Sequence, residues 1–285
     1  MSKITYLLGA GASCNALPLV NNFKDRLKSF FNKDIWGALQ IRFQIEKTSA
    51  HELFPYNGQY GKDFMESVSW LINVADKHAS IDTYAKKLFV RNDNDALKEL
   101  NKLKSTLSCY FLLEQSLKPV DKRYDNFFAS ILTNDGSGIP KLPEGVNIIT
   151  WNYDTQLEKS YEGFCSHPEI VFEKFLQSKN IIRLNGSCGF KYADETKYLG
   201  YTEFSISFLQ SVIELYTKFM NPSEPKFQPN ISFAWEKNDI EDKVKQELQG
   251  TTTLVIIGYS LPYFNREIDQ MIINAVRPTL VKIFI

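Results

Sequence analysis

The chain has 285 residues, 44% of them hydrophobic, so it is long enough to bury one large core or a core with a subdomain. Lys plus Arg and Asp plus Glu are each 33, and the resulting formal net charge of zero argues against direct nucleic-acid binding. The sequence contains no signal peptide and no run of about 18 apolar residues, which predicts a cytoplasmic protein without a membrane segment.

The first predicted element is an apolar strand, Ile4–Leu8, that ends in small residues. The chain continues as Gly9-Ala10-Gly11-Ala12-Ser13. A strand that breaks into such a turn before a helix presents backbone N–H groups to an anion such as a pyrophosphate. No third glycine precedes the helix, so the loop departs from the dehydrogenase fingerprint, and a tight turn without a ligand is the alternative.

Helices are predicted for much of the chain between this strand and Val146. Apolar residues recur at helical spacing in Phe64–Val74 and in Leu97–Leu113. The same spacing returns over Phe204–Phe219, and the proline-containing segment Asn221–Asn230 after it is expected to be a mobile loop.

Three later segments are also predicted to be strands with polar tips. They contain Thr150-Trp151-Asn152-Tyr153-Asp154, Leu184-Asn185-Gly186-Ser187 and Gly258-Tyr259-Ser260-Leu261. Their β-branched runs lack polar alternation, which is typical of strands buried on both faces of a parallel sheet. Because ligands bind at the carboxyl ends of such strands, we expect one cleft to collect Ser13, Asn152, Asp154, Asn185 and Ser260.

These elements predict an α/β protein with a Rossmann-like parallel sheet and an inserted helical lobe. We expect the sheet from residues 1–30 and 146–285, and the lobe from about 31–145. The last residues, Leu280–Ile285, form an apolar strand, which suggests that the native protein extends beyond them.

The four strand tips, in this order, resemble those of the sirtuin-like fold. Gly9–Ser13 is similar to the family's Gly-Ala-Gly-x-Ser phosphate loop, and Thr150–Asp154 to its Thr-Gln-Asn-x-Asp motif. Gly258–Leu261 is similar to its Gly-[Thr/Tyr]-Ser-Leu turn. Ser80–Lys87 and Pro262–Asp269 resemble signatures of the bacterial sirtuin-like domains that hydrolyse NAD in anti-phage defence.

The resemblance implies an NAD+ glycohydrolase that forms ADP-ribose and nicotinamide and depletes NAD during abortive infection. NAD is then the substrate, and no metal is implied. The family also implies a homo-oligomer, with a hexameric translocase-type ATPase as a partner. The implied catalytic residues are Asn152, Asp154 and Asn185. The implied NAD-binding residues are Gly9, Ala10, Gly11, Ala12, Ser13, Thr150, Asn152, Asp154, Gly186, Gly258, Tyr259 and Ser260.

The resemblance also implies a role for each part of this set. The loop amides and Ser13 would hold the pyrophosphate, and Ser260 would contact the adenosine side. Asn152 would hold the ribose or the attacking water, while Asp154 would fix that strand tip. Position 185 would face the ribose hydroxyls.

Asn185 departs from the family pattern, which has a catalytic His at this position. Asn cannot accept a proton at neutral pH, so a step that needs a general base should slow by about 10²–10⁴-fold, roughly 3–5 kcal/mol. Two explanations are open. Either Asn was introduced to keep NAD intact, which agrees with the fit of the other cleft residues to an active enzyme, or it is a natural residue that the chemistry tolerates.

Three other functions are open. A protein deacylase shares the NAD chemistry, but its usual zinc ribbon needs two Cys-x-x-Cys pairs, and Cys14, Cys109, Cys165 and Cys188 form none. A non-catalytic sensor of NAD or ADP-ribose would keep Asn185 as its natural residue. An assembly module would chiefly bind the partner ATPase.

Overall fold

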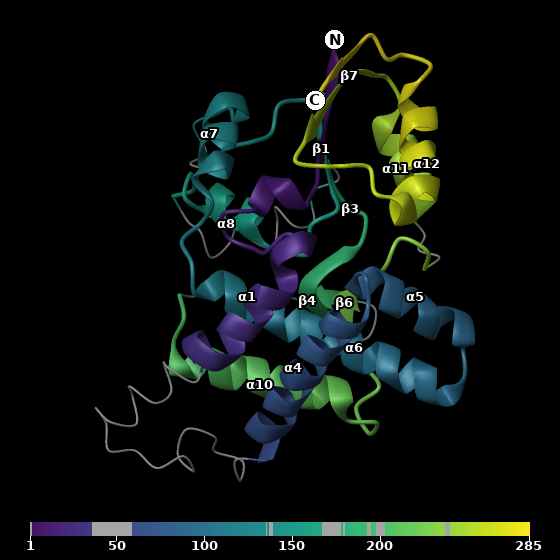
Figure 1. Cartoon of the computed structure of the whole chain (residues 1–285). Coiled ribbons are helices and arrows are strands. Elements are labelled where there is room, and N and C mark those ends of the chain that lie inside the picture. The colour runs from purple at the N-terminus through teal and green to yellow at the C-terminus, as the bar shows by residue number, and fades with distance from the viewer. Residues whose placement is uncertain are drawn as a thin grey trace. The chain divides into compact units, whose positions relative to one another are not determined.

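The computed structural model describes residues 2–35, 59–134, 136, 139–166, 178, 180–192, 195–197, 203–236 and 240–285. These residues form two compact units (Figure 1). Unit 1 comprises Met1–Leu17, Val120–Ser187 and Ser232–Ile285, and unit 2 comprises Pro18–Pro119 and Cys188–Ile231.

Unit 1 is built on a five-stranded sheet with the order β3-β2-β1-β7-β8. Its strands are β1 (Lys3–Leu8), β2 (Val146–Thr150), β3 (Ile181–Arg183), β7 (Thr251–Ile257) and β8 (Lys282–Phe284). All four neighbouring pairs run parallel. Every residue of β2 is buried, as expected for a strand covered on both faces. The α/β class with a Rossmann-like parallel sheet is therefore confirmed.

The two faces of this sheet are covered by different helices (Figure 1). Leu7, Ile149 and Ile182 pack with α11 (Ile240–Leu248) and α12 (Arg266–Val276). The adjacent residue in each strand, Leu8, Ile148 or Ile181, packs with α7 (Lys122–Ile131) and α8 (Gln156–Glu162). Successive side chains of a strand point to opposite faces, so each apolar run contributes side chains to both hydrophobic cores. Burying each such side chain stabilises the fold by about 1.5–3 kcal/mol.

The strand order reverses between β1 and β7. The chain passes from β1 to β2 and β3 on one side, and β7 and β8 then extend the sheet on the other. Leu8 is paired with both Thr150 and Ile257, so the tips of β1, β2 and β7 begin at the same level. In open parallel sheets the crevice at such a reversal is the usual ligand site.

Unit 2 consists of helices and a three-stranded sheet with the order β5-β4-β6. Its main helices are α1 (Phe23–Ser29), α4 (Gln59–Lys77), α5 (Ile81–Arg91), α6 (Asn94–Ser116) and α10 (Ile206–Met220). Its strands are β4 (Gly186–Tyr192), β5 (Glu195–Lys197) and β6 (Phe227–Ile231). The side chains of Ser80, Asp93 and Ser205 cap α5, α6 and α10 by accepting a backbone N–H in the first turn.

Short helical turns complete the described elements. They are η1 (Ala10–Ser13), η2 (Val20–Asn22), η3 (Phe30–Ile35) and η4 (Tyr263–Asn265). The helical spacing over Phe64–Val74, Leu97–Leu113 and Phe204–Phe219 corresponds to α4, α6 and α10. The expected loop over Asn221–Asn230 is wrong in its second half, because Phe227–Ile231 is strand β6 beside β4.

The boundaries between the two units differ from the ranges expected from the sequence for the sheet and the helical lobe. The helix α7 lies in unit 1 because Tyr124 and Phe128 pack into the core on the sheet. Residues 188–231, expected in the Rossmann-like part, belong to unit 2 with the helices. The helical unit is thus assembled from two separate insertions into the sheet unit.

Candidate functional site

The loops after β1 and β7 pack backbone against backbone. The N–H of Gly9 donates to Ile257 O at 2.9 Å, and that of Gly11 donates to Gly258 O at 2.8 Å. Gly258 has a φ of +61°, and a Cβ there would lie 2.3 Å from Ala12 N. Glycine is therefore required at position 258 by both its conformation and the close approach of the other loop.

Most of the amides expected to hold a pyrophosphate are already paired. Besides Gly9 and Gly11, the N–H of Ala12 donates to Gly9 O at 2.9 Å. Ala10–Ser13 form the four-residue 3₁₀ helix η1, which is too short to have an appreciable macrodipole. The pyrophosphate role of these amides stays a prediction, and it would require three hydrogen bonds to be exchanged.

Ser13 and Asn152 meet in a buried polar cluster. Asn152 Nδ2 donates to Ser13 Oγ at 3.1 Å and to Tyr124 Oη at 3.4 Å, and the two hydroxyls share a hydrogen bond of 2.9 Å. Thr150 Oγ1 accepts the backbone N–H of Asn152 at 3.0 Å. Burial, and then the charge of Asp154, raise the pKa of Tyr124, so its hydroxyl stays protonated. The structure brings Thr150, Ser13 and Asn152 together as predicted and adds Tyr124.

Asp154 is buried and stabilises the backbone that follows β2. Its carboxylate is buried and accepts the N–H of Gln156 at 3.0 Å. Burial raises its pKa, which hydrogen bonds from Gln156 and Ser13 and the charge of Arg183 partly offset. Arg183 Nη1 donates to the carbonyls of Asn152 and Asp154 at 3.0 and 2.9 Å, and Nη2 pairs with Glu158. The backbone of this tip is thereby fixed from two sides.

Asn185 lies at the tip of β3 and is only 7% exposed. Its Nδ2 donates to Tyr153 Oη at 3.4 Å, and Tyr153 Oη donates to Ser232 O at 3.2 Å. The backbone O of Asn185 accepts the N–H of Ser232 at 2.9 Å. Within the described residues, its side-chain Oδ1 is buried and has no hydrogen-bond partner. Leaving such an acceptor unpaired costs about 1–3 kcal/mol. Gly186 follows with a φ of +70°, which allows the turn into β4.

The loop after β7 places Tyr259 on the face of the sheet that is covered by α11 and α12. Tyr259 stacks on Trp151 with ring centroids 5.7 Å apart, and both contact the core beneath α11 and α12. Tyr259 Oη donates to the Asp269 carboxylate at 2.8 Å and accepts from Asn265 Nδ2 at 3.0 Å. Burial raises the pKa of Asp269 to about 6, although the bond from Tyr259 opposes the shift. Ser260 is exposed. Of the predicted residues, Ser13 and Asn152 thus meet beside Tyr124 of α7, whereas Tyr259 lies on the side of α11 and α12.

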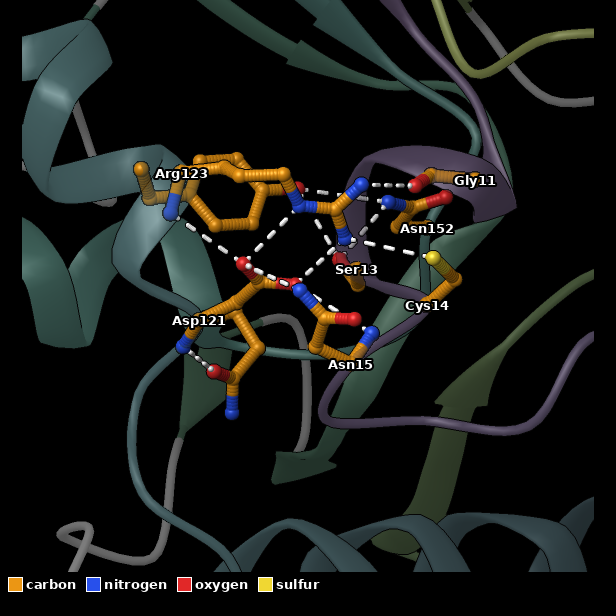
Figure 2. A network of polar contacts seen from close by, with 9 residues as sticks. Gly11, Ser13, Cys14, Asn15, Asp121, Arg123 and Asn152 are labelled. Atoms are coloured by element: carbon orange, nitrogen blue, oxygen red, sulfur yellow. Dashed lines mark hydrogen bonds and ion pairs between the residues drawn. The ribbon is translucent and has the colours of Figure 1, made fainter.

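An ion pair that the sequence did not reveal lies against the loop after β1 (Figure 2). Asp121 accepts from Arg123 Nε at 2.9 Å and from the backbone and side-chain nitrogens of Asn15, each at 3.3 Å. Arg123 donates from Nη1 to Gly11 O at 3.0 Å and from Nη2 to Cys14 Sγ at 3.4 Å. Burial would raise the pKa of Asp121, but the hydrogen bonds and charge of Arg123 outweigh it and lower it to about 2. More than a hundred residues separate this pair from the loop, and no local pattern marks it.

Two further properties concern only the part of the chain that the structure describes. No group of three or more His, Cys, Asp or Glu side chains there could hold a metal ion. None of its helices is both long enough and apolar enough to cross a membrane.

No protein-family model matches the chain, and none of the curated proteins matches it. The sirtuin-like resemblance accordingly rests on the motifs alone, and the chemistry has to be argued from the site.

Proposed function

We propose that this protein binds NAD at the carboxyl ends of β1, β2, β3 and β7 and hydrolyses its nicotinamide–ribose bond. The observation that carries the proposal is the gathering of Ser13, Asn152 and Asn185 at the edge of a parallel sheet whose order reverses between β1 and β7. Dinucleotides bind this kind of sheet at that place. The resemblance of the same tips to sirtuin-like motifs supplies the reaction type.

The residues at this edge fit a nucleotide. Gly9, Gly11 and Gly258 let two loop backbones approach each other beside the edge, where a Cβ on any of them would lie within 3 Å of a neighbouring atom. The Oδ1 of Asn185 is buried and lacks a partner among the described residues, so it would accept a hydrogen bond from a sugar hydroxyl once the atoms that cover it move aside. A bound ribose would thus remove an unfavourable feature of the free protein.

The proposed reaction breaks the bond between the ribose C1′ and the nicotinamide nitrogen. The bonding electron pair leaves with nicotinamide, water adds its oxygen to C1′, and one proton is released to solvent. The transition state is an electron-poor ribosyl cation, so catalysis depends mainly on orientation and on a placed water. Asn152 is fixed by Ser13 and Tyr124 and would orient the ribose or the water. Asn185 would bind the ribose hydroxyls without taking a proton.

A second candidate is a non-catalytic sensor of NAD or ADP-ribose. The observation that favours it is that Asn152 and Asn185 are both amides, and the amide nitrogen of Asn152 is already bound to two buried hydroxyls. A site with these groups recognises a ribose but offers no base. A protein deacylase has less support, because the cysteine spacing provides no zinc ribbon.

Nicotinamide release from NAD by the purified chain distinguishes these functions. We expect slow release by the wild type and release at least about tenfold faster by Asn185→His, since a general base contributes 10²–10⁴-fold. Asn274→His, on the exposed side of α12, is the matched control and should not change the rate. Binding of NAD without release in either protein would favour the sensor. Failure of both proteins to bind NAD by calorimetry would overturn the proposal.

The cellular role is proposed from the resemblance. We propose a cytoplasmic NAD-depleting effector of anti-phage defence that works as a homo-oligomer, with a hexameric translocase-type ATPase as its partner. Unregulated NAD hydrolysis is toxic, so control by assembly would be needed. Light scattering at micromolar protein should report at least twice the 32.9 kDa of one chain. A monomer over that range would contradict the homo-oligomer.

A further inference from the structure

We propose that Arg123 binds the diphosphate of the nucleotide at the loop Gly11–Asn15. The inference rests on the proposed function, since it names the residue that recognises one part of that substrate. Neither the motifs nor the resemblance points to this residue.

The loop itself offers little to a diphosphate. The N–H groups of Gly9, Gly11 and Ala12 are bound to backbone oxygens, and that of Asn15 is bound to the Asp121 carboxylate. A diphosphate carries negative charge that must be met by donors or cations when it is bound. The described residues therefore have to supply this charge from outside the loop.

Arg123 is in place to do so. Its guanidinium donates to both Gly11 and Cys14 and thereby bridges two residues of the loop (Figure 2). The side chain is 46% exposed, whereas that of its partner Asp121 is fully buried. The ion pair therefore presents its positive member to solvent and keeps its negative member beneath.

The guanidinium also keeps donor capacity. An arginine has five N–H groups in a planar fork. One on Nε and one on Nη2 go to Asp121, a second on Nη2 goes to Cys14 Sγ, and one on Nη1 goes to Gly11 O. Among the described residues, no acceptor takes the second N–H on Nη1, and the bonds to Gly11 O and Cys14 Sγ are the ones that a phosphate oxygen could replace. Phosphate is the stronger acceptor for a guanidinium, because it is itself charged and can accept two parallel N–H groups of the planar fork.

Asp121 holds the guanidinium in this position before any ligand arrives. The carboxylate accepts from Arg123 and Asn15, and the backbone N–H of Asp121 donates to Gln156 Oε1 at 3.0 Å. Hydrogen bonding lowers its pKa to about 2, so it remains ionised at any physiological pH. A preorganised cation binds its ligand with a smaller loss of side-chain entropy.

Calorimetry with three probes tests the role of Arg123. Arg123→Gln should weaken binding of NAD and of inorganic pyrophosphate by at least about tenfold, as expected for loss of charge-assisted hydrogen bonds. Binding of adenosine, which has no phosphate, should stay within about twofold, since its contacts are elsewhere. Lys122→Gln removes the neighbouring exposed charge and should change NAD affinity far less.

Two more variants keep the test decisive. Because Arg123→Gln leaves the buried Asp121 carboxylate unpaired, the double variant Asp121→Asn/Arg123→Gln is measured in parallel, with folding checked by circular dichroism. Arg123→Lys keeps the charge but loses the fork, and it should recover only part of the affinity.

The outcomes separate the inference from the proposed function. Unchanged affinity for NAD and pyrophosphate in a folded variant would overturn the role of Arg123. An equal loss for adenosine would also overturn it, because Arg123 would then only position the loop. If the wild type binds pyrophosphate through Arg123 but does not bind NAD, the proposed function fails and the anion site stands. A wild type that binds neither contradicts both.

Discussion

The tips of β2 and β3 carry two asparagines that are equally buried but differently paired. Asn152 and Asn185 are each 7% exposed. The side chain of Asn152 is bound to Ser13 and Tyr124, and its backbone to Thr150 and Arg183. Asn185 has one long side-chain bond to Tyr153, and its Oδ1 has no partner in the described part of the chain.

This difference separates a framework from a place that receives a ligand. Buried polar groups are normally satisfied, so the network around Asn152 is what a folded protein is expected to build. An unsatisfied acceptor of the same burial costs stability and is retained where it serves binding. Under the proposed function, the tip of β2 holds the geometry in which Asn152 would orient the ribose or the water, and Asn185 at the tip of β3 would bind the ribose hydroxyls.

Gly258→Ala should give the largest effect, because it breaks the framework where the β1 and β7 loops meet. The new Cβ would lie 2.3 Å from Ala12 N at a φ of +61°. Backbone overlap and positive φ together should lower the free energy of unfolding by about 4 kcal/mol or more. Urea denaturation measures the change.

Gly136→Ala is the control for this change. Gly136 has a φ of +82°, but among the described residues nothing lies within 4 Å of the added Cβ. It should cost only the conformational term, about 1–2 kcal/mol. Similar losses at the two glycines would show that the contact between the loops is not tight.

Replacing each asparagine by leucine, which has a similar volume, tests the comparison directly. Asn152→Leu should lower the free energy of unfolding by about 2–3 kcal/mol, because it leaves Ser13 and Tyr124 with fewer partners. Asn185→Leu should change it by less than about 1 kcal/mol in either direction, since it removes an acceptor that was unpaired. Denaturant melts report both values.

Although Asn185→Leu should hardly change stability, it should strongly affect NAD binding. Asn185→Leu should abolish binding in a protein that remains folded, because the proposed acceptor for the sugar hydroxyls is lost. If Asn185→Leu were the more destabilising of the two leucine variants, the assignment of framework and receiving tip would be reversed.

Two carboxylates extend the contrast to the pH dependence of stability. Burial raises the pKa of Asp269 from 3.8 to about 6, so the fold favours its neutral form. The contribution of Asp269 to stability should be greatest below about pH 4 and should fall by about 1–2 kcal/mol as the pH rises from 4 to 6, after allowance for solvent screening. Asp269→Asn should remove this loss in melts taken across that range.

Asp121 should respond in the other direction. Its pKa falls from 3.8 to about 2 in the fold, so its contribution is present above pH 4 and disappears as the pH falls from about 4 to 2. Asp121→Asn should flatten stability in this acid range only. A change in the pH 4–6 range instead would mean that the two carboxylates have been assigned to the wrong transitions.

Tyr124→Phe should give a small loss of stability. It removes one hydroxyl from the paired cluster, while Ser13 and Asn152 keep their mutual bond of 3.1 Å. We expect a loss of about 1 kcal/mol, the net contribution of a typical hydrogen bond. Thermal melts measure it, and Tyr161→Phe, whose hydroxyl is bound to Pro140 O in the same core, is the matched control.

The sheet could be predicted from the sequence because its signal is local. Ile4–Leu8, Ile148–Thr150 and Leu254–Ile257 are apolar or β-branched runs, and each is a strand. The helices around Phe64–Val74 and Leu97–Leu113 could also be predicted, from the helical spacing of their apolar residues. The strand Phe227–Ile231 could not be predicted, because Pro229 and the polar residues beside it resemble a loop, and only pairing in a second sheet defines this strand.

The site could be predicted only in part, for the same reason. Ser13 and Asn152 follow strands that could be predicted, and the carboxyl ends of parallel strands lie at the same edge of a sheet, so their contact could be expected. Tyr124 and Arg123 reach the loop from a helix 111 and 112 residues further along the chain. Their role depends on α7 packing on the sheet, which is a property of the tertiary structure.

The central position of β1 has a consequence for synthesis of the chain. Thr5 is hydrogen-bonded to Thr251, 246 residues later, and β1 pairs along its length with β7. At about 5–20 residues per second, the ribosome needs roughly 12–50 s to make that partner. During this time β1 has an open edge on one side, and contacts so distant in sequence form late. We expect the nascent chain to depend on chaperones until β7 emerges, and the β1 loop to acquire its final geometry among the last parts of the molecule.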